Sequence, residues 1–320
     1  MMLIMDLTRR GFLGAVVAIG LAGCAPMPDP RINAPEPTWS RPPIWYQAAE
    51  TELALATAYA TAAVLFSLMG MHVEGRIEWC EAASKMHADH AAFLTTPDPW
   101  RGYRPPPEIT TDANLEEPSL TELIAAATEN ATTALAQAPA GPEALLWASL
   151  MACCAVGAAW STNQVAAPPP PPVYNTVRPS KIVLDSAATA AGPVLDRYYA
   201  LDYALTTALG RLGGGNSLRA AVESRLVEVK AQQRSLQEMM HAGGVTPPAP
   251  ALSYELSDGL SGERAIRASW NTLEASLGLP GIYLAGCQSG DEAVETAKWA
   301  CEKLVRNPRQ QITWWPTWPA

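Results

Sequence analysis

The apolar residues of this chain recur at the three- and four-residue spacing of an α-helix. The clearest example is a single seam formed by Leu195, Tyr198, Leu205, Leu209 and Leu212. Runs of β-branched residues are scarce, and clusters of proline separate the apolar segments. This pattern is typical of helices joined by proline-rich connections and predicts an all-α protein.

Glycine, proline and capping residues divide the pattern into two sets of helices. In the first half we expect helices near residues 45–71, 73–95, 119–138 and 142–162. In the second half we expect them near residues 186–212, 216–242, 259–286 and 290–306. Asn216 and Ser289 are suited to N-cap positions. Pro280 should kink or break the third helix of the second half, because proline disrupts a helix interior.

Two proline-rich stretches interrupt the helical pattern. Residues 24–43 form the first, and residues 167–180 form the second, which contains five consecutive prolines. Such sequences favour an extended, solvated backbone. We therefore expect a tether over 24–43, a helical bundle over 44–166, a linker over 167–180 and a second bundle over 181–320.

The two halves also resemble each other. With an offset of 150 positions, residues 54–97 align on residues 204–247 without a gap and share ten identical residues. Each half predicts a helical hairpin, a long proline-rich connection and a second hairpin. Short connections on either side of one long crossover are the topology of ferritin-like four-helix bundles. The sequence therefore predicts two tandem copies of one module.

Particular segments carry a resemblance to a known family. They are Asp202–Leu205 on the first predicted helix of the second half and Gly243–Leu256 after its second helix. The first half shows a fainter match at Pro105–Ile109. The chain resembles the ferritin-like domain of unknown function found in exported bacterial lipoproteins. The resemblance implies two ferritin-like bundles in tandem, and it brings no established activity.

The amino terminus carries a second resemblance, to an export signal. Arg9 and Arg10 are followed by Phe12 and Leu13, in the order of the twin-arginine signal. The apolar run after the arginines, residues 11–23, would span only about 20 Å as a helix, short of a bilayer core of about 30 Å. A cleaved signal peptide over residues 1–23 therefore fits better than a permanent anchor.

The signal ends in Leu21-Ala22-Gly23-Cys24, which resembles a lipoprotein box. The resemblance implies cleavage before Cys24 and attachment of a diacylglyceryl group to its thiol. Two acyl chains suffice for stable membrane anchoring. We expect a protein exported by the twin-arginine route and anchored to the outer face of the cytoplasmic membrane or in the cell envelope. The alternative is an ordinary signal peptide with a coincidental cysteine.

The charge of the chain limits its partners. The formal net charge is −9, and no basic run occurs. This balance argues against nucleic-acid binding. If exposed, the tryptophan-rich tail, Trp314, Trp315 and Trp318, could anchor the chain to an envelope protein or to the membrane interface. The same tryptophans could fold back to cap the second bundle, and both alternatives stay open.

Two acidic residues fall where an apolar side chain is expected. Asp202 lies on the apolar seam between Tyr198 and Leu205, and Glu52 is its equivalent 150 positions earlier. A carboxylate inside a bundle is unfavourable unless it is hydrogen-bonded or bound to a metal. One interpretation is a hydrogen bond to a tyrosine, histidine or arginine across the bundle. The other is a site for iron or manganese, whose candidate ligands are Glu52, His87 and His90 in the first half and Asp202, Glu238 and His241 in the second.

A complete di-iron site is not expected. Such sites need a Glu-x-x-His motif on two helices and a glutamate from each of two others. Only Glu238 to His241 has that form. The sequence also lacks a Gly-x-Ser-x-Gly element and a glycine-rich phosphate loop between a strand and a helix. We therefore favour a non-catalytic binding or scaffold protein, with a metal-binding protein loaded before export as the alternative.

Five cysteines follow Cys24. Outside the cytoplasm a disulfide is permitted, and Cys80 with Cys153 or Cys154 would join two helices of one bundle. The alternative is that these cysteines are small buried thiols.

Overall fold

A computed structural model describes residues 41–68, 75–96, 109, 119–161, 184–256 and 259–306. These residues belong to one compact unit, Arg41–Ala320. Within the described ranges the regular structure is entirely helical, as the hydrophobic pattern predicts. The signal residues Arg9, Arg10, Phe12 and Leu13, together with Cys24, the linker 167–180 and the tail tryptophans Trp314, Trp315 and Trp318, lie outside the described residues.

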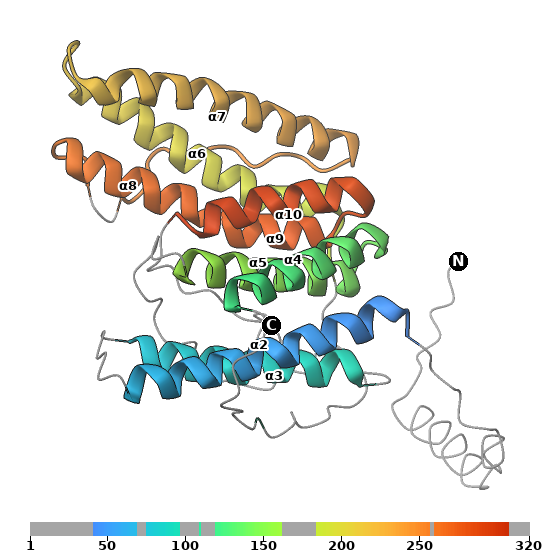
Figure 1. Cartoon of the computed structure of the whole chain (residues 1–320). Helices are drawn as coiled ribbons and strands as arrows, with labels where there is room; N and C mark the ends of the chain where they lie inside the picture. The colour runs from blue at the N-terminus through green and yellow to red at the C-terminus, as the bar shows by residue number, and fades with distance from the viewer. Residues whose placement is uncertain are drawn as a thin grey trace, which may run out of the picture. The chain divides into compact units, whose positions relative to one another are not determined.

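The first half contains two helical hairpins. Helices α2 (Pro43–Leu68) and α3 (Arg76–Thr95) pack against each other, as do α4 (Leu120–Gln137) and α5 (Pro142–Ser161). Figure 1 shows α2 and α3 lying side by side. Ser119 and Glu122 form a capping box at the start of α4, which fixes where that helix begins.

The second half is built in a similar way, with one additional break. Its helices are α6 (Ala187–Arg211), α7 (Ser217–Ala242), α8 (Glu263–Ser276), α9 (Gly278–Gly286) and α10 (Gly290–Leu304). The third predicted helix is divided at Leu277, three residues before Pro280, so that the proline falls in the first turn of α9. Asn216 caps α7 by accepting a hydrogen bond from the amide of Leu218, whereas Ser289 precedes α10 without a side-chain cap.

Three hydrophobic clusters hold the helices together. One lies within the first half and includes Leu55, Trp79 and Met86. A second lies within the second half and includes Leu195, Tyr198 and Val222. The third combines residues of α2, α3, α4 and α5 with residues of α9 and α10. The two halves therefore have separate cores and share a further one.

Close backbone contact joins α5 to α9. The amide of Gly141 donates a hydrogen bond of 2.8 Å to the carbonyl of Gly286. A Cβ atom at Gly286 would lie 2.7 Å from the Cβ of Leu145. Only glycine allows α9 to approach α5 this closely.

In the part of the chain that the structure describes, two helices are long and apolar enough to cross a membrane, judged by length and composition alone. In α5, 83% of the most apolar 18-residue window is buried, which is typical of the core helix of a globular protein. In α2 only 28% of the equivalent window is buried.

Candidate metal centre

Glu52, His87 and His90 meet in the core of the first half. Glu52 lies on the buried face of α2, between Ala48 and Leu55. His87 and His90 are three residues apart in α3, so both side chains lie on one face of that helix. Oε2 of Glu52 accepts hydrogen bonds from Nδ1 of His87 at 2.6 Å and from Nδ1 of His90 at 2.9 Å. We call these residues the Glu-His-His cluster.

The cluster is closed to solvent. Glu52 is 2% exposed, His87 is 3% exposed and His90 is fully buried. Burial alone would raise the pKa of Glu52, but the charges and hydrogen bonds of His87 and His90 outweigh it and lower the pKa to about 2. Glu52 is therefore ionised at neutral pH inside an apolar core.

Tyr59 covers one side of the cluster. Its ring stacks on His87, with the ring centroids 5.3 Å apart and the planes 7° from parallel. Its hydroxyl lies over Gly157 of α5, where a Cβ atom would be only 2.7 Å from the hydroxyl oxygen. Gly157 therefore gives Tyr59 the space to stack on His87.

Buried thiols lie in the same core. Cys80, Cys153 and Cys154 are buried, and they are free thiols in the structure. Burial is the main cause that raises the pKa of Cys80 to about 12 and the pKa of Cys153 and Cys154 well above the ordinary value. A raised pKa keeps these thiols neutral at ordinary pH, and the disulfide between Cys80 and Cys153 or Cys154 stays a prediction.

The donor atoms of the cluster suit a divalent transition metal. One donor atom from each of the three residues lies within 4.8 Å of the other two. Two imidazoles and a carboxylate are a common ligand set for zinc and for non-haem iron. Adjacent ligands about 2.1 Å from an ion in octahedral geometry lie about 3.0 Å apart. The separations of 2.6 and 2.9 Å are close to that value, and a shared ion would replace these hydrogen bonds, because each Nδ1 must lose its proton to bind a metal.

The equivalent site is not assembled in the second half. Asp202 is half-buried and accepts hydrogen bonds from Gln233 and Thr206. Glu238 and His241 are exposed on α7, and the structure brings neither of them to Asp202 in a group of metal donors. Within the described ranges, the Glu-His-His cluster is the one group of three such donors close enough to share an ion.

A different polar centre occupies the core of the second half, and sequence analysis missed it. Glu274 of α8 is fully buried and accepts hydrogen bonds from Nε of Arg225 at 2.6 Å and Nζ of Lys303 at 2.7 Å. The indole of Trp270 donates a third, at 3.1 Å. Burial opposes ionisation of Glu274, but the two cations outweigh it and lower its pKa. These contacts connect α7, α8 and α10.

A signal for this centre is present in the sequence. Ile266, Trp270 and Glu274 follow one another at four-residue intervals, so they share one face of α8. Glu274 thus interrupts an apolar seam in the same way as Glu52, and the same reasoning would have identified it.

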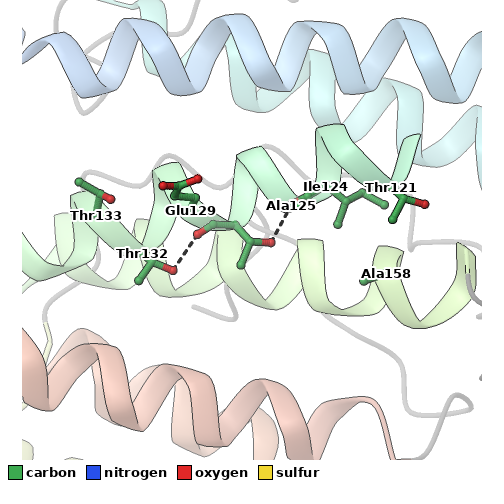
Figure 2. Close-up of a pocket in the computed structure, with 8 residues that line it drawn as sticks. Thr121, Ile124, Ala125, Glu129, Thr132, Thr133 and Ala158 are labelled. Atoms are coloured by element: carbon green, nitrogen blue, oxygen red, sulfur yellow. Dashed lines mark hydrogen bonds between the residues drawn. The ribbon is translucent and has the colours of Figure 1, made fainter. Parts of the chain in front are cut away.

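A hollow of about 460 Å³ is lined by residues of α4 and α5 (Figure 2). Four threonines, Glu129 and three apolar residues line it. The hydroxyls of Thr128 and Thr132 donate to backbone carbonyls of α4 at 2.8 and 2.7 Å, so these donors are already used. The lining indicates no particular ligand.

No family model, curated protein or solved structure matches this chain.

Proposed function

We propose that this chain is a non-catalytic metal-binding protein that holds one divalent first-row transition metal ion at Glu52, His87 and His90. The observation that carries the proposal is the meeting of three metal-type donors from two helices in a closed core. An ion bound there would be held by two neutral imidazoles and one carboxylate, and would balance the charge of the buried carboxylate.

The closure of the site argues for binding and against catalysis. The three donors are almost completely buried, so a bound ion would not meet a substrate from solution. A single three-ligand site also differs from the paired sites of oxygen-activating bundles. We propose that the two halves are tandem ferritin-like bundles in which the first retains part of an ancestral ligand set and the second has lost it.

The sequence of the amino terminus supports an envelope location for this activity. We propose export of the folded chain by the twin-arginine route and lipid attachment at Cys24, with iron or manganese acquired in the cytoplasm. The arginine pair, the short apolar run and the cysteine box occur in the order that this route requires. Palmitate labelling of the full chain and of Cys24→Ser tests the anchor separately from the metal, and an unlabelled wild-type chain would contradict it.

Elemental analysis tests the metal site directly. The full chain is purified after growth with iron, manganese and zinc supplied in turn, and we expect about one ion per chain for one of them. Glu52→Gln and His90→Asn should each remove it, because two remaining ligands bind weakly. Asp202→Asn is the matched control and should keep the full content.

Two results would reject a metal function. The first is metal-free protein whose melting temperature is unchanged by added iron, manganese or zinc. The second is metal that stays bound in both Glu52→Gln and His90→Asn. In either case the cluster would be a hydrogen-bonded polar centre of the core.

A further inference from the structure

One face of α2 is apolar and exposed. Tyr46, Leu53, Val64 and Leu68 are separated by 7, 11 and 4 residues, so they lie along one side of the helix. Their exposed fractions are 46%, 39%, 46% and 78%. The stripe they form is about 33 Å long at a rise of about 1.5 Å per residue. We call it the α2 stripe.

The α2 stripe carries one charge, on the exposed Glu50, which lies on the same side of the helix between Tyr46 and Leu53. From Leu53 to Leu68 the helix contains no acidic or basic residue, and α2 as a whole contains no lysine or arginine. Helix α7 makes a useful contrast. Its one large exposed apolar residue, Val227, is 71% exposed but lies between Arg225 and Glu228 in a strongly charged sequence. Val227 is therefore an isolated surface residue, whereas α2 has several exposed apolar residues and no charged residue from Leu53 to Leu68.

Packing among the described residues leaves much of the apolar surface of α2 exposed. Its mean hydropathy over the most apolar window is 1.4, close to the 1.5 of the core helix α5. Yet only 28% of that window is buried, against 83% in α5. Ala48, Glu52, Leu55 and Tyr59 are among the residues that form the buried side of α2, which faces the core.

We propose that the α2 stripe lies in the interfacial region of a lipid bilayer. A bilayer takes up an apolar helix face without specific shape or charge matching, and the apolar side of such a helix enters to a depth of about 5–10 Å. Tyr46 at one end suits the headgroup level. The net charge of −9 means that attraction to anionic lipids contributes little, so the contact depends on apolar burial and is insensitive to salt.

The position of α2 in the sequence also favours a lipid bilayer. α2 is the first described helix after Cys24, and the 18 residues between Cys24 and Pro43 span at most about 60 Å. A lipid on Cys24 would therefore keep α2 near the membrane surface.

Site-specific photo-crosslinking in cells tests the proposal on the full chain. Benzoylphenylalanine is introduced at Val64 or Leu53, and at Val227 as the control, in a bacterial host that exports the protein. We expect adducts with the mass of a phospholipid at positions 64 and 53 and none at position 227. Cross-links to a second copy or to another protein, no adduct at 64 and 53, or equal lipid adducts at 227 would each overturn the proposal.

A charge substitution gives a second, quantitative test. Val64→Glu with Leu68→Glu should lower the lipid-adduct yield at position 53 about tenfold, because carboxylates resist transfer into an apolar phase. Val227→Glu should leave the yield unchanged. The substituted positions are exposed, so the melting temperature should also be unchanged. An unchanged adduct yield in the folded double variant would contradict the α2 stripe as the membrane contact.

Discussion

At the scale of single residues, the first half depends on one buried charge. Glu52 is ionised because two histidines hold its Oε2 atom, and both donors come from the neighbouring helix. In isolation a carboxylate in this core would take up a proton. The same arrangement that suits a metal ion also stabilises the metal-free fold, so the two roles must be measured separately.

The pH dependence of stability reports the metal-free role. The pKa of Glu52 is lowered from 4.5 to about 2. Its contribution is therefore present above about pH 4.5 and is lost as the pH falls toward about 2. We expect the gap in unfolding free energy between wild type and Glu52→Gln to shrink by about 1.4 kcal/mol per pH unit below 4.5.

Urea unfolding between pH 5 and pH 3, in the presence of a chelator, measures this gap. Subtracting the variant removes the contributions of other carboxylates such as Glu274, whose pKa is also lowered. A gap of the same size at both pH values would show that Glu52 is not the ionised partner of the histidines.

Gly157 is predicted to position Tyr59. In Gly157→Ala the new methyl group would lie 2.7 Å from the Tyr59 hydroxyl oxygen, so the ring must leave His87 or α5 must shift. We expect a loss of about 2 kcal/mol, typical of overpacking. Adding Tyr59→Phe removes the clashing oxygen and should restore part of the loss, as measured by a double-mutant cycle in urea.

Gly210→Ala is the matched control for Gly157→Ala. A Cβ atom at Gly210, in α6, meets nothing within 4 Å. This variant should be neutral or more stable by about 0.5 kcal/mol, because alanine is the better helix former. If the two substitutions change the unfolding free energy equally, the contact between residue 157 and Tyr59 does not contribute to stability.

At the scale of helices, the sequence predicts where a helix begins and ends when a capping residue, glycine or proline marks that position. The described helices begin and end within a few residues of the predicted limits, because proline, glycine and capping residues act locally. Glu52 was identified for a similar reason, since it interrupts an apolar seam. Asp202 met the same criterion, but its partner on α7 is Gln233, which no helical period could reveal. A partner across a bundle depends on how two helices face each other.

Glu274 of α8 links three helices through its ion pairs with Arg225 of α7 and Lys303 of α10. Glu274→Gln would leave Arg225 and Lys303 without their shared counter-charge, and we expect a loss of about 4 kcal/mol. Lys303→Met keeps the paired contacts of Arg225 with both oxygens of Glu274, at 2.6 and 3.2 Å. It should lose only about 2 kcal/mol.

Chemical denaturation of the two variants ranks the contacts. The predicted order is wild type, then Lys303→Met, then Glu274→Gln. The opposite order would show that Lys303, and not Arg225, is the main partner of the buried carboxylate.

At the scale of the whole molecule, the sequence similarity between the two halves predicts that both contain similar helices, but it does not predict how the halves join. Each half has a core of its own, and a third cluster combines α5 with α9 and α10. The internal repeat could not predict this third cluster, because contacts between copies are not repeated within a copy. The shared core implies that the described halves unfold together in one transition.

Gly286→Ala tests whether the two halves unfold together, because Gly286 lies where α9 approaches α5 closely. The added Cβ would lie 2.7 Å from the Cβ and 2.9 Å from the Cα of Leu145, so relief requires movement of the α5 backbone away from α9. We expect a loss of about 3 kcal/mol and, in calorimetry, separation of the single wild-type transition into two. Gly210→Ala should keep one transition. Two transitions already present in the wild type, and unchanged by Gly286→Ala, would mean that the halves fold independently and that the shared cluster adds little to stability.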